Sequence, residues 1–488
     1  MWKVGYDNNK YLQTQSAHIQ ERLESFGGKL YLEFGGKLYD DYHAARVLPG
    51  FEPDSKLQML LKLKDQVEMI IAINAADIEK NKIRGDLGIT YDRDVIRLIN
   101  IFRDLGLYVS SVVLTRYAHQ PGAKAFQSRL ENMGVKVYHH FAIAGYPADT
   151  AHIVSDEGFG ANDYIETSRE LVVVTAPGPG SGKLATCLSQ LYHEHKRGIQ
   201  AGYAKFETFP VWNLSLNHPV NLAYEAATAD LSDVNMIDPF HLDAYGETTV
   251  NSHRDVDAFP VLVAMFEKIL GQCPYKSPTD MGVNMVGNCI TDDAAVRAAS
   301  SQEIVRRYYD ALCEQKKGKL SDDVVFKLEL LMRKAGVTPE IRRVVAPALN
   351  RAEETGDAAA AMELPDGTIV TGKTSDLLGA SSALLLNALK KLAGMPDDLH
   401  LISHVALDPI QHLKVDHLGN RNPRLHTDET LIALSISAAT NPLAEHAMEQ
   451  LSKLRGCDVH SSVILSAVDE KTFKRLGVHL TCEPRYGA

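Results

Sequence analysis

Closely paired cysteines and long apolar runs are both missing from this sequence. No C-x-x-C pair occurs, so neither a disulfide framework nor a cysteine zinc site is indicated, and we expect reduced thiols. The six cysteines are Cys187, Cys273, Cys289, Cys313, Cys457 and Cys482. The N-terminus lacks the apolar core of a signal peptide, and no segment reaches the roughly 18 uninterrupted apolar residues that a membrane helix needs. These absences predict a cytoplasmic protein without a membrane partner.

A surplus of basic residues is also absent, since the formal net charge is -11. This acidity argues against a nucleic-acid-binding surface spread over the molecule, although it is compatible with a local basic pocket. Apolar residues at 45% and charged residues at 23% are typical of a soluble globular protein. With 488 residues the chain is longer than one hydrophobic core usually organises, so we expect about two to four domains.

The first half of the chain alternates short apolar runs with helix patterns, as an α/β domain does. Residues 92–106 place Val95, Ile99 and Phe102 on one stripe and end at a glycine, which predicts a crossover helix. The alternation predicts an α/β fold over residues 1–250, with a largely parallel sheet in a three-layer arrangement. Strands are predicted at 69–74, 107–115, 135–140, 152–155 and 171–176.

An eight-residue repeat, FGGKLYLE followed by FGGKLYDD, occupies residues 26–41. It is too short for a solenoid unit and predicts two glycine turns that flank a short strand. Lys29 and Lys37 beside the glycines could meet an anion, but turn chemistry with solvated lysines is the favoured interpretation.

The pattern changes after residue 250, where long helix patterns such as SDDVVFKLELLMRKAG predict a helical subdomain over residues 251–344. Further on, AMELPDGTIVTG predicts a hairpin around Asp366-Gly367, and a helix pattern follows it. The end of the chain has the pattern of a strand, a helix and a strand. We therefore predict a C-terminal α+β domain over residues 345–488.

A glycine-rich stretch, APGPGSGK, follows the apolar run LVVVT and precedes the helix pattern KLATCLSQLYHEH. A strand, a glycine turn with inward amides, a lysine and a helix N-terminus together make a phosphate-binding loop. The stretch predicts a P-loop-like strand, turn and helix that bind a nucleotide or a phosphorylated metabolite. The candidate binding residues are Gly178, Gly180, Ser181, Gly182, Lys183 and Thr186.

This stretch departs from the G-x-x-x-x-G-K-[ST] pattern at two positions. Pro177 stands where the first glycine is expected, and Leu184 stands where a hydroxyl would bind magnesium. Ser181 or Thr186 could replace that hydroxyl, so ATP or another nucleotide, with Mg²⁺, remains a candidate cofactor. Several predicted strands precede the loop, whereas phosphate loops commonly follow the first strand of a domain. A tight structural turn is the alternative.

Residues 367–374, GTIVTGKT, satisfy the same pattern completely. TIVT is β-branched and follows a PDG turn, so it predicts a strand rather than a loop of inward amides. Nucleotide binding is not expected there. Lys373, Thr374 and Ser375 are expected to open a helix, whose N-terminus could meet an anion of a second substrate.

Other titratable side chains gather in four places. His193-Glu194-His195 lacks the spacing of an H-E-x-x-H zinc motif, and its two histidines cannot share a helix face, so it predicts a polar helix end. Asp156-Glu157 follows a predicted strand and would suit a magnesium-bound water if it lay beside the loop. Within residues 227–246 and 401–429 we consider four catalytic candidates, against the alternative of caps, solvated turns and helix-surface networks. These candidates are Asp238, His241, His412 and Asp416.

Long stretches of the chain resemble a bacterial family grouped as domain of unknown function 1846. They include LYLEFGGKLYDDYHAARVLPGF, TAPGPGSGKLATCLSQLYHEHKRG and QHLKVDHLGNRNPRLHTDE, and the resemblance spans nearly the whole chain. It implies a cytosolic protein of several α/β and helical domains that forms a homo-oligomer, and it supplies no reaction. Some members carry the label of ATP-dependent protease, but this chain has no H-E-x-x-H motif and no convincing serine or cysteine nucleophile motif.

Two functions follow from these observations. In the first, the protein is an enzyme that binds a nucleotide or phosphorylated metabolite at residues 178–183, where Lys183 neutralises charge. In the second, it is an oligomeric ligand-binding or regulatory protein without catalysis. An enzyme of the first kind should place a carboxylate within about one magnesium coordination sphere of Lys183, whereas a binding protein need not.

Overall fold

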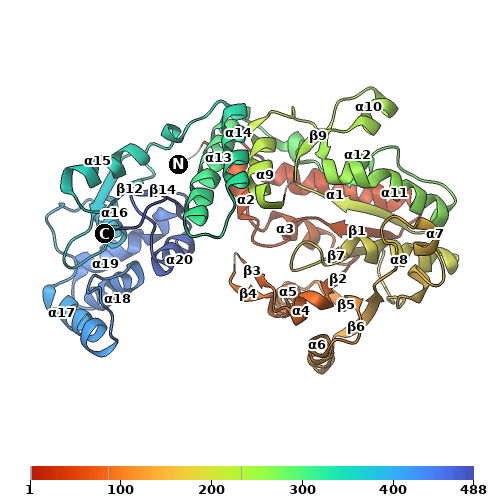
Figure 1. The fold of residues 1–488 in the computed structure, drawn as a ribbon, viewed down its shortest axis with the longest axis horizontal. Coiled ribbons are helices and arrows are strands. Elements are labelled where there is room, and N and C mark those ends of the chain that lie inside the picture. The colour runs from red at the N-terminus through yellow and green to blue at the C-terminus, as the bar shows by residue number, and fades with distance from the viewer. Residues whose placement is uncertain (1–2, 86, 232, 488) are drawn as a thin grey trace. The chain divides into compact units, whose positions relative to one another are not determined.

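The structure is a computed structural model that describes residues 3–85, 87–231 and 233–487. The chain divides into two compact units (Figure 1). The N-terminal unit comprises Val4–Glu225 and Ser232–Arg297, and the C-terminal unit comprises Ala298–Ala488 with Met1–Lys3 and Ala226–Leu231. Within the described ranges, no helix combines the length and the apolar character needed to cross a membrane.

A seven-stranded sheet forms the centre of the N-terminal unit, and every strand pair in it is parallel. The spatial order is β11-β8-β1-β7-β2-β5-β6. The core strands β1, β2 and β7 are buried along their whole length, as expected for a sheet covered on both faces. The strands are β1 (Leu30–Phe34), β2 (Val67–Asn74), β5 (Tyr108–Tyr117), β6 (Lys136–Phe141), β7 (Leu171–Thr175), β8 (Gly202–Phe206) and β11 (Gly282–Val283).

Helices cover both faces of this sheet, which confirms the predicted α/β class and its three layers. Helices α8 and α11 pack on one face, where Leu188, Leu191 and Phe266 join Tyr31 and Val172 of the sheet in one apolar cluster. On the other side, α5 contacts β2 and β5, and α1 contacts β11 and α3. The helices of this unit are α1 (Asn8–Ser25), α2 (Tyr42–Val47), α3 (Ser55–Lys62), α4 (Ala75–Glu79), α5 (Tyr91–Asp104), α6 (Pro121–Asn132), α7 (Thr150–Ile153), α8 (Lys183–Lys196), α9 (Pro219–Ala227), α10 (Pro239–Tyr245), α11 (His253–Leu270) and α12 (Pro278–Met281). Two short antiparallel pairs complete it: β3 (Ile83–Arg84) with β4 (Ile89–Thr90), and β9 (Asn235–Ile237) with β10 (Val250–Ser252).

The direction of the chain reverses within the sheet between β2 and β7. After β2 the chain continues outward through β5 to β6, whereas after β7 it crosses β1 to reach β8 and then β11. In open parallel sheets, ligands bind outside the carboxyl ends of the strands at such a switch point. We therefore expect a ligand site at the carboxyl edge of this sheet, where β1, β2, β5, β7 and β8 end.

Four of the five predicted strands are confirmed, as β2, β5, β6 and β7, and the predicted helix at 92–106 is α5. The prediction of a strand at 152–155 is wrong, because these residues lie in and just after the short helix α7. Asp149 caps this helix by accepting a hydrogen bond from the amide of His152. Ile153 then packs into the apolar cluster beneath α8. Strands β8 and β11 were not predicted.

The C-terminal unit contains a mixed four-stranded sheet in the order β13-β12-β14-β15. Helix α16 packs on one face of this sheet and α15 on the other. The strands are β12 (Ala359–Glu363), β13 (Ile369–Lys373), β14 (Asp458–Ser461) and β15 (His479–Cys482). The helices are α13 (Asp293–Lys316), whose first residues are assigned to the N-terminal unit, and α14 (Asp322–Ala335), α15 (Val345–Thr355), α16 (Ala380–Leu392), α17 (His404–His412), α18 (Thr427–Ala438), α19 (Pro442–Glu449) and α20 (Ala467–Arg475). The predicted hairpin and the closing strand, helix and strand are confirmed as β12–β13 and β14–α20–β15.

The second glycine-lysine motif lies in this hairpin, as its β-branched residues predicted. Gly372 is required by packing, since a Cβ there would lie 2.2 Å from the backbone nitrogen of Leu384 in α16. The expectation that Lys373 opens a helix is wrong, because Lys373 ends β13 and pairs with Asp357 at 3.2 Å. The helix begins only at Ala380, after a turn.

The helices predicted as a separate subdomain at 251–344 are divided between the two units. Helices α11 and α12 belong to the N-terminal unit and α14 to the C-terminal unit. The bounds of the three predicted domains stay a prediction.

Candidate functional site

The glycine loop, residues 176–182, follows β7 and leads directly into α8. Three of its carbonyl oxygens accept hydrogen bonds from side chains. Asn74 Nδ2, at the end of β2, donates to Gly180 O at 3.4 Å, and Thr115 Oγ1, in β5, donates to Ser181 O at 2.8 Å. Within the loop, Ser181 Oγ donates to Gly178 O at 2.9 Å. The loop is therefore fixed from the sheet side through its carbonyl groups.

The amides of the same loop have no acceptor among the residues that the structure describes. The N–H groups of Gly178, Gly180, Ser181, Gly182 and Lys183 donate no hydrogen bond there. In a trans peptide the N–H points opposite to the C=O of the preceding residue. Because the carbonyls of Gly180 and Ser181 are held by the sheet, the amides of Ser181 and Gly182 face away from it. The amide of Lys183 adds the unpaired N-terminus of α8.

Glycine is required in this loop for two physical reasons. Gly180 and Gly182 have φ of +76° and +89°, where other residues are strained. Gly178 has no positive φ, but a Cβ on it would lie 2.2 Å from the hydroxyl oxygen of Tyr91 at the start of α5. At Gly182 a Cβ would also lie 3.0 Å from Thr115. The glycines allow the loop to lie directly on neighbouring side chains.

Lys183 is the first residue of α8 and is partly buried. Its Nζ forms no ion pair and no hydrogen bond with any described residue. Three positions later, the side chain of Thr186 is fully buried and its Oγ1 has no hydrogen-bond partner within the described ranges. A half-buried ammonium group and an unsatisfied hydroxyl thus adjoin the unpaired amides, an arrangement that suits an anionic ligand.

Backbone strain occurs at the same edge of the sheet. Arg116 and His119, at and just beyond the end of β5, have φ of 50° and 60° although neither is glycine. Such conformations cost about 1–3 kcal/mol each and concentrate at ligand sites and switch regions. Arg116 directly follows Thr115, which supports the loop.

The proposed magnesium-water ligand, Asp156, does not reach Lys183. Its carboxylate accepts a hydrogen bond from Tyr192 Oη at 2.6 Å and pairs with Lys196 at 3.1 Å. Tyr192 lies nine residues along α8 from Lys183, or about 13 Å at 1.5 Å per residue. Asp156 therefore lies toward the far end of α8. Its predicted place at the end of a strand is wrong because residues 150–153 are helical.

The catalytic candidates Asp238 and His241 lie beside each other and take part in helix caps. Asp238 Oδ1 accepts from the amides of Phe240 and His241, and its Oδ2 accepts from Thr279 Oγ1 at 2.6 Å. His241 Nδ1 lies 2.8 Å from Oγ of Ser277, which caps α12. Both side chains are buried and satisfied by these contacts. These contacts agree with the alternative interpretation, in which the two residues cap helices. A catalytic role for them stays a prediction.

His412 and Asp416 form the predicted i, i+4 pair, with Nδ1 and Oδ2 2.8 Å apart. Their side chains are 77% and 57% exposed. The hydrogen bond to Asp416 raises the pKa of His412 above its usual value. The pair lies in the C-terminal unit, whereas the glycine loop lies in the N-terminal unit. Side chains this exposed are typical of an ion pair on a helix surface. A catalytic role for the pair stays a prediction.

A more buried histidine lies a short way along the chain from that pair. His426 Nδ1 is 3.1 Å from Asp469 Oδ2, and Asp469 also accepts from the amide of Thr427 and from Ser466 Oγ. Burial alone would raise the pKa of Asp469, but these hydrogen bonds, that of His426 first, lower it to about 2. Ser466 contacts the same Nδ1 that faces Asp469, so the three side chains form a helix cap and not a nucleophile with its base.

We expect the C-terminal unit to lose stability as the pH falls from about 4 to about 2. The pKa of Asp469 is lower in the folded state, so its contribution is complete above the unfolded pKa and is lost on acidification through the folded one. The loss should be about 2 kcal/mol. Urea unfolding of the wild type and of Asp469→Asn at pH 5 and pH 2.5 measures it. The variant should be less stable at pH 5 and lose less on acidification; an equal loss in both proteins would contradict the assignment.

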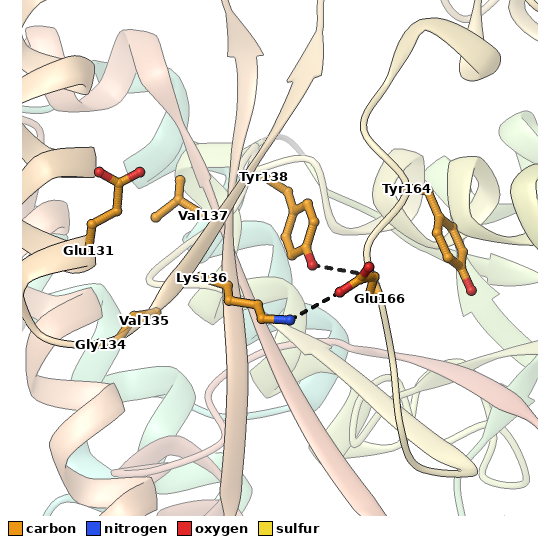
Figure 2. A pocket seen from close by; sticks show the side chains of 8 residues that line it. All are labelled: Glu131, Gly134, Val135, Lys136, Val137, Tyr138, Tyr164 and Glu166. Atoms are coloured by element: carbon orange, nitrogen blue, oxygen red, sulfur yellow. Dashed lines mark hydrogen bonds and ion pairs between the residues drawn. The ribbon is translucent and has the colours of Figure 1, made fainter.

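A pocket of about 590 Å³ lies at the edge strand β6 (Figure 2). It adjoins the beginning of β6, which is the edge of the sheet opposite to the glycine loop. Figure 2 shows Lys136 and Tyr138 of β6 pointing toward Glu166, and the lysine pairs with this glutamate at 3.0 Å. Beside the pocket, the amides of His139 and Phe141 donate to Asp163 and Asn162, so this strand edge is already occupied. The lining residues are Glu131, Gly134, Val135, Lys136, Val137, Tyr138, Tyr164 and Glu166.

The residues that support the loop were not predicted from the sequence. Asn74 and Thr115 were within or next to predicted strands, and Tyr91 adjoined a predicted helix, but no role was assigned to them. A usable signal was present, because MIIAIN and VVLT each close an apolar strand with a polar residue. In a parallel sheet such residues gather at one edge.

Fold and loop together define an α/β protein with a seven-stranded parallel sheet and a glycine loop at its switch point. The chain belongs to the family described as domain of unknown function DUF1846, whose N-terminal domain matches residues 4–336 and whose C-terminal domain matches residues 340–488. The resemblance found in the sequence is thereby confirmed.

Relatives at about 60% identity extend over almost the entire chain. A UPF0371 protein of Corynebacterium urealyticum is 59% identical over 484 residues, which cover 99% of this chain and 97% of the relative. A UPF0371 protein of Streptococcus thermophilus is 59% identical over 486 residues, covering 100% and 98%. A UPF0371 protein of Corynebacterium diphtheriae is 60% identical over 484 residues, covering 99% and 97%.

Proposed function

We propose that the N-terminal unit binds the phosphate group of a small molecule on the glycine loop. The observation that carries this proposal is the set of consecutive amides at Ser181, Gly182 and Lys183, which have no acceptor in the described part of the chain. Those of Ser181 and Gly182 point away from the sheet. The N-terminal dipole of α8 and the unpaired ammonium group of Lys183 add positive potential at the same place. The position at the switch point of the sheet agrees with where α/β proteins bind ligands.

The loop suits anchoring of a phosphate better than magnesium-dependent phosphoryl transfer. Leu184 occupies the position of the usual magnesium-binding hydroxyl. Ser181, one suggested replacement, donates its hydroxyl to Gly178 O, and Asp156 lies toward the far end of α8. The phosphate would therefore serve as a handle that positions the rest of the ligand. A nucleotide or a phosphorylated metabolite satisfies this role.

One observation favours a second candidate, a protein that holds the ligand without turning it over. No carboxylate of the described residues contacts Lys183. A carboxylate there was the feature expected of a magnesium-dependent enzyme. The two candidates share the same phosphate site, so the binding experiment below tests both.

Replacing Lys183 by alanine should weaken phosphate binding by at least about tenfold, since hydrogen bonds to charged groups contribute roughly 1.5–3 kcal/mol. Isothermal titration calorimetry with inorganic phosphate and with ADP measures the change. Lys196→Ala is the matched control, because Lys196 lies at the other end of α8 and pairs there with Asp156 and the Tyr192 ring. If the wild type binds neither probe, or if the Lys183 and Lys196 variants bind them equally well, the proposal is wrong.

A further inference from the structure

A second polar cluster lies at the carboxyl edge of the same sheet. Lys205, the next-to-last residue of β8, contacts two carboxyl groups: its Nζ is 2.5 Å from Glu207 Oε1 and 2.5 Å from Asp255 Oδ2. Glu207 directly follows β8, and Asp255 lies in the first turn of α11. These three residues, here called the β8 cluster, come from the end of a strand and the beginning of a helix, as the glycine loop does.

The β8 cluster and the glycine loop lie at the same carboxyl edge of the sheet, on the two sides of β1. Glu33 of β1 is the register partner of both Lys205 in β8 and Val174 in β7. Two strand spacings correspond to about 10 Å, the length of a small phosphorylated metabolite. Helices α8 and α11 begin at this edge, contact each other and bury one common apolar cluster. One ligand can therefore reach both places.

The side chains of the β8 cluster are reachable from solvent but not free in it. Those of Lys205, Glu207 and Asp255 are 21%, 16% and 23% exposed. Next to Glu207, the hydroxyl of Thr208 is buried and has no hydrogen-bond partner in the described ranges. A buried hydroxyl without a partner is an independent indication that a polar group of a ligand belongs here.

The charges of the β8 cluster select the kind of group that it can bind. Two carboxylates face one ammonium group, and the nearby Glu33 accepts a hydrogen bond from Tyr203 at 2.8 Å. A second phosphate would find the ammonium group of Lys205 already paired and would be repelled by the carboxylate of Asp255, and an apolar base would leave charged groups unpaired. Hydroxyl groups fit, because each can donate to a carboxylate and accept from the ammonium group.

We infer that the ligand of the glycine loop is a sugar phosphate, whose phosphate lies on the loop and whose hydroxyl groups bind the β8 cluster. This inference rests on the proposed function and narrows it from phosphorylated molecules in general to one class. It assigns the position of the phosphate to the end of β7 and that of the sugar to the ends of β1 and β8.

The same geometry makes sugar binding depend on pH. Burial, together with the negative charge of Asp255, raises the pKa of Glu207 to about 8 against the opposing effect of Lys205. Tyr203 of β8, Tyr224 of α9 and Glu33 of β1 are further titratable groups near this cluster. Below pH 8 the Glu207 carboxyl group keeps its proton and can donate to a hydroxyl. Above pH 8 it ionises and can no longer donate. The affinity for a sugar phosphate should therefore fall above pH 8, whereas the affinity for inorganic phosphate should not.

Calorimetric titration of the full chain at pH 7 with five probes tests the inference. The probes are inorganic phosphate, glucose 6-phosphate, fructose 6-phosphate, ribose 5-phosphate and ADP. At least one sugar phosphate should bind about tenfold more tightly than inorganic phosphate, and Glu207→Ala, which removes the hydrogen-bonding group, should abolish this gain while leaving phosphate affinity unchanged. Glu166→Ala, which removes a carboxylate from an exposed lysine pair at β6, is the matched control and should keep the gain.

The outcomes separate the inference from the function on which it rests. If no probe binds the wild type, the proposed function is wrong and the inference falls with it. If phosphate binds but no sugar phosphate binds more tightly, or ADP binds more tightly than every sugar phosphate, only the inference is overturned. The same holds if the gain survives Glu207→Ala. Should that variant fail to fold by circular dichroism, Asp255→Asn takes its place with the same expected loss.

Discussion

Replacing Asp458 by alanine is expected to lower the free energy of unfolding of the C-terminal unit by about 3–5 kcal/mol. Asp458 lies in β14 and pairs with Arg342 at 3.1 Å, and the arginine side chain is only 1% exposed. Arg342 also donates to the carbonyl of His479 at 3.0 Å, which would remain in the variant. The substitution therefore leaves a buried guanidinium group without a counter-charge. Urea unfolding followed by circular dichroism measures the loss.

The neighbouring residue in the sequence supplies a matched control for this pair. Arg343 pairs with Glu363 at 2.5 Å, but the arginine is 61% exposed. Exposed pairs contribute at most about 1 kcal/mol, because water screens them and side-chain entropy opposes them. Glu363→Ala should thus change the unfolding free energy by less than this amount. If the two variants lose similar amounts, burial of Arg342 is not the cause.

Replacing Gly178 by valine should abolish phosphate binding, with a loss of at least about a hundredfold. A Cβ at this position lies 2.2 Å from the Tyr91 hydroxyl oxygen and 2.6 Å from its ring, so either the loop or the start of α5 must move. Movement of the loop turns the amides of Ser181 and Gly182 away from their common direction. Overpacking of this kind also costs roughly 1–3 kcal/mol of stability. Titration with inorganic phosphate and thermal unfolding measure both effects.

Gly180→Ala distinguishes this steric effect from backbone strain. Gly180 has φ of +76°, but nothing lies within 4 Å of a Cβ placed on it. Alanine there should cost about 1 kcal/mol of strain and weaken phosphate binding far less than the valine at position 178. Equal losses in both variants would show that the direct contact with Tyr91 does not position the loop.

The sequence predicted those parts of the fold that depend on local patterns. The apolar runs of β2, β5, β6 and β7 and the stripe of α5 were evident because burial on both faces or on one face leaves a period in the sequence. Strand β8 was missed because GYAKF is short and carries Lys205 inside it. The wrong prediction of a strand at residues 152–155 has a related cause. A run of only four residues is too short for its pattern to distinguish a strand from the capped helical turn of α7.

The candidate site shows the same limit. The loop residues from Gly178 to Lys183 are contiguous, so their pattern predicts a local structure. The supporting contacts from Asn74 and Thr115, and the lysine shared by Glu207 and Asp255, join residues far apart in the sequence. Strand order decides which of these residues meet, and no local periodicity encodes that order. Self-association, the cytoplasmic location and the absence of nucleic-acid partners stay predictions.

The position of β7 has a consequence for how the chain matures during synthesis. Strand β1 pairs only with β7 and β8, although β2, β5 and β6 leave the ribosome before either of them. A nascent chain that ends before residue 171 therefore holds β1 with both edges open. Such open edges invite aggregation, so the emerging half-sheet needs shielding until β7 arrives and joins the two halves.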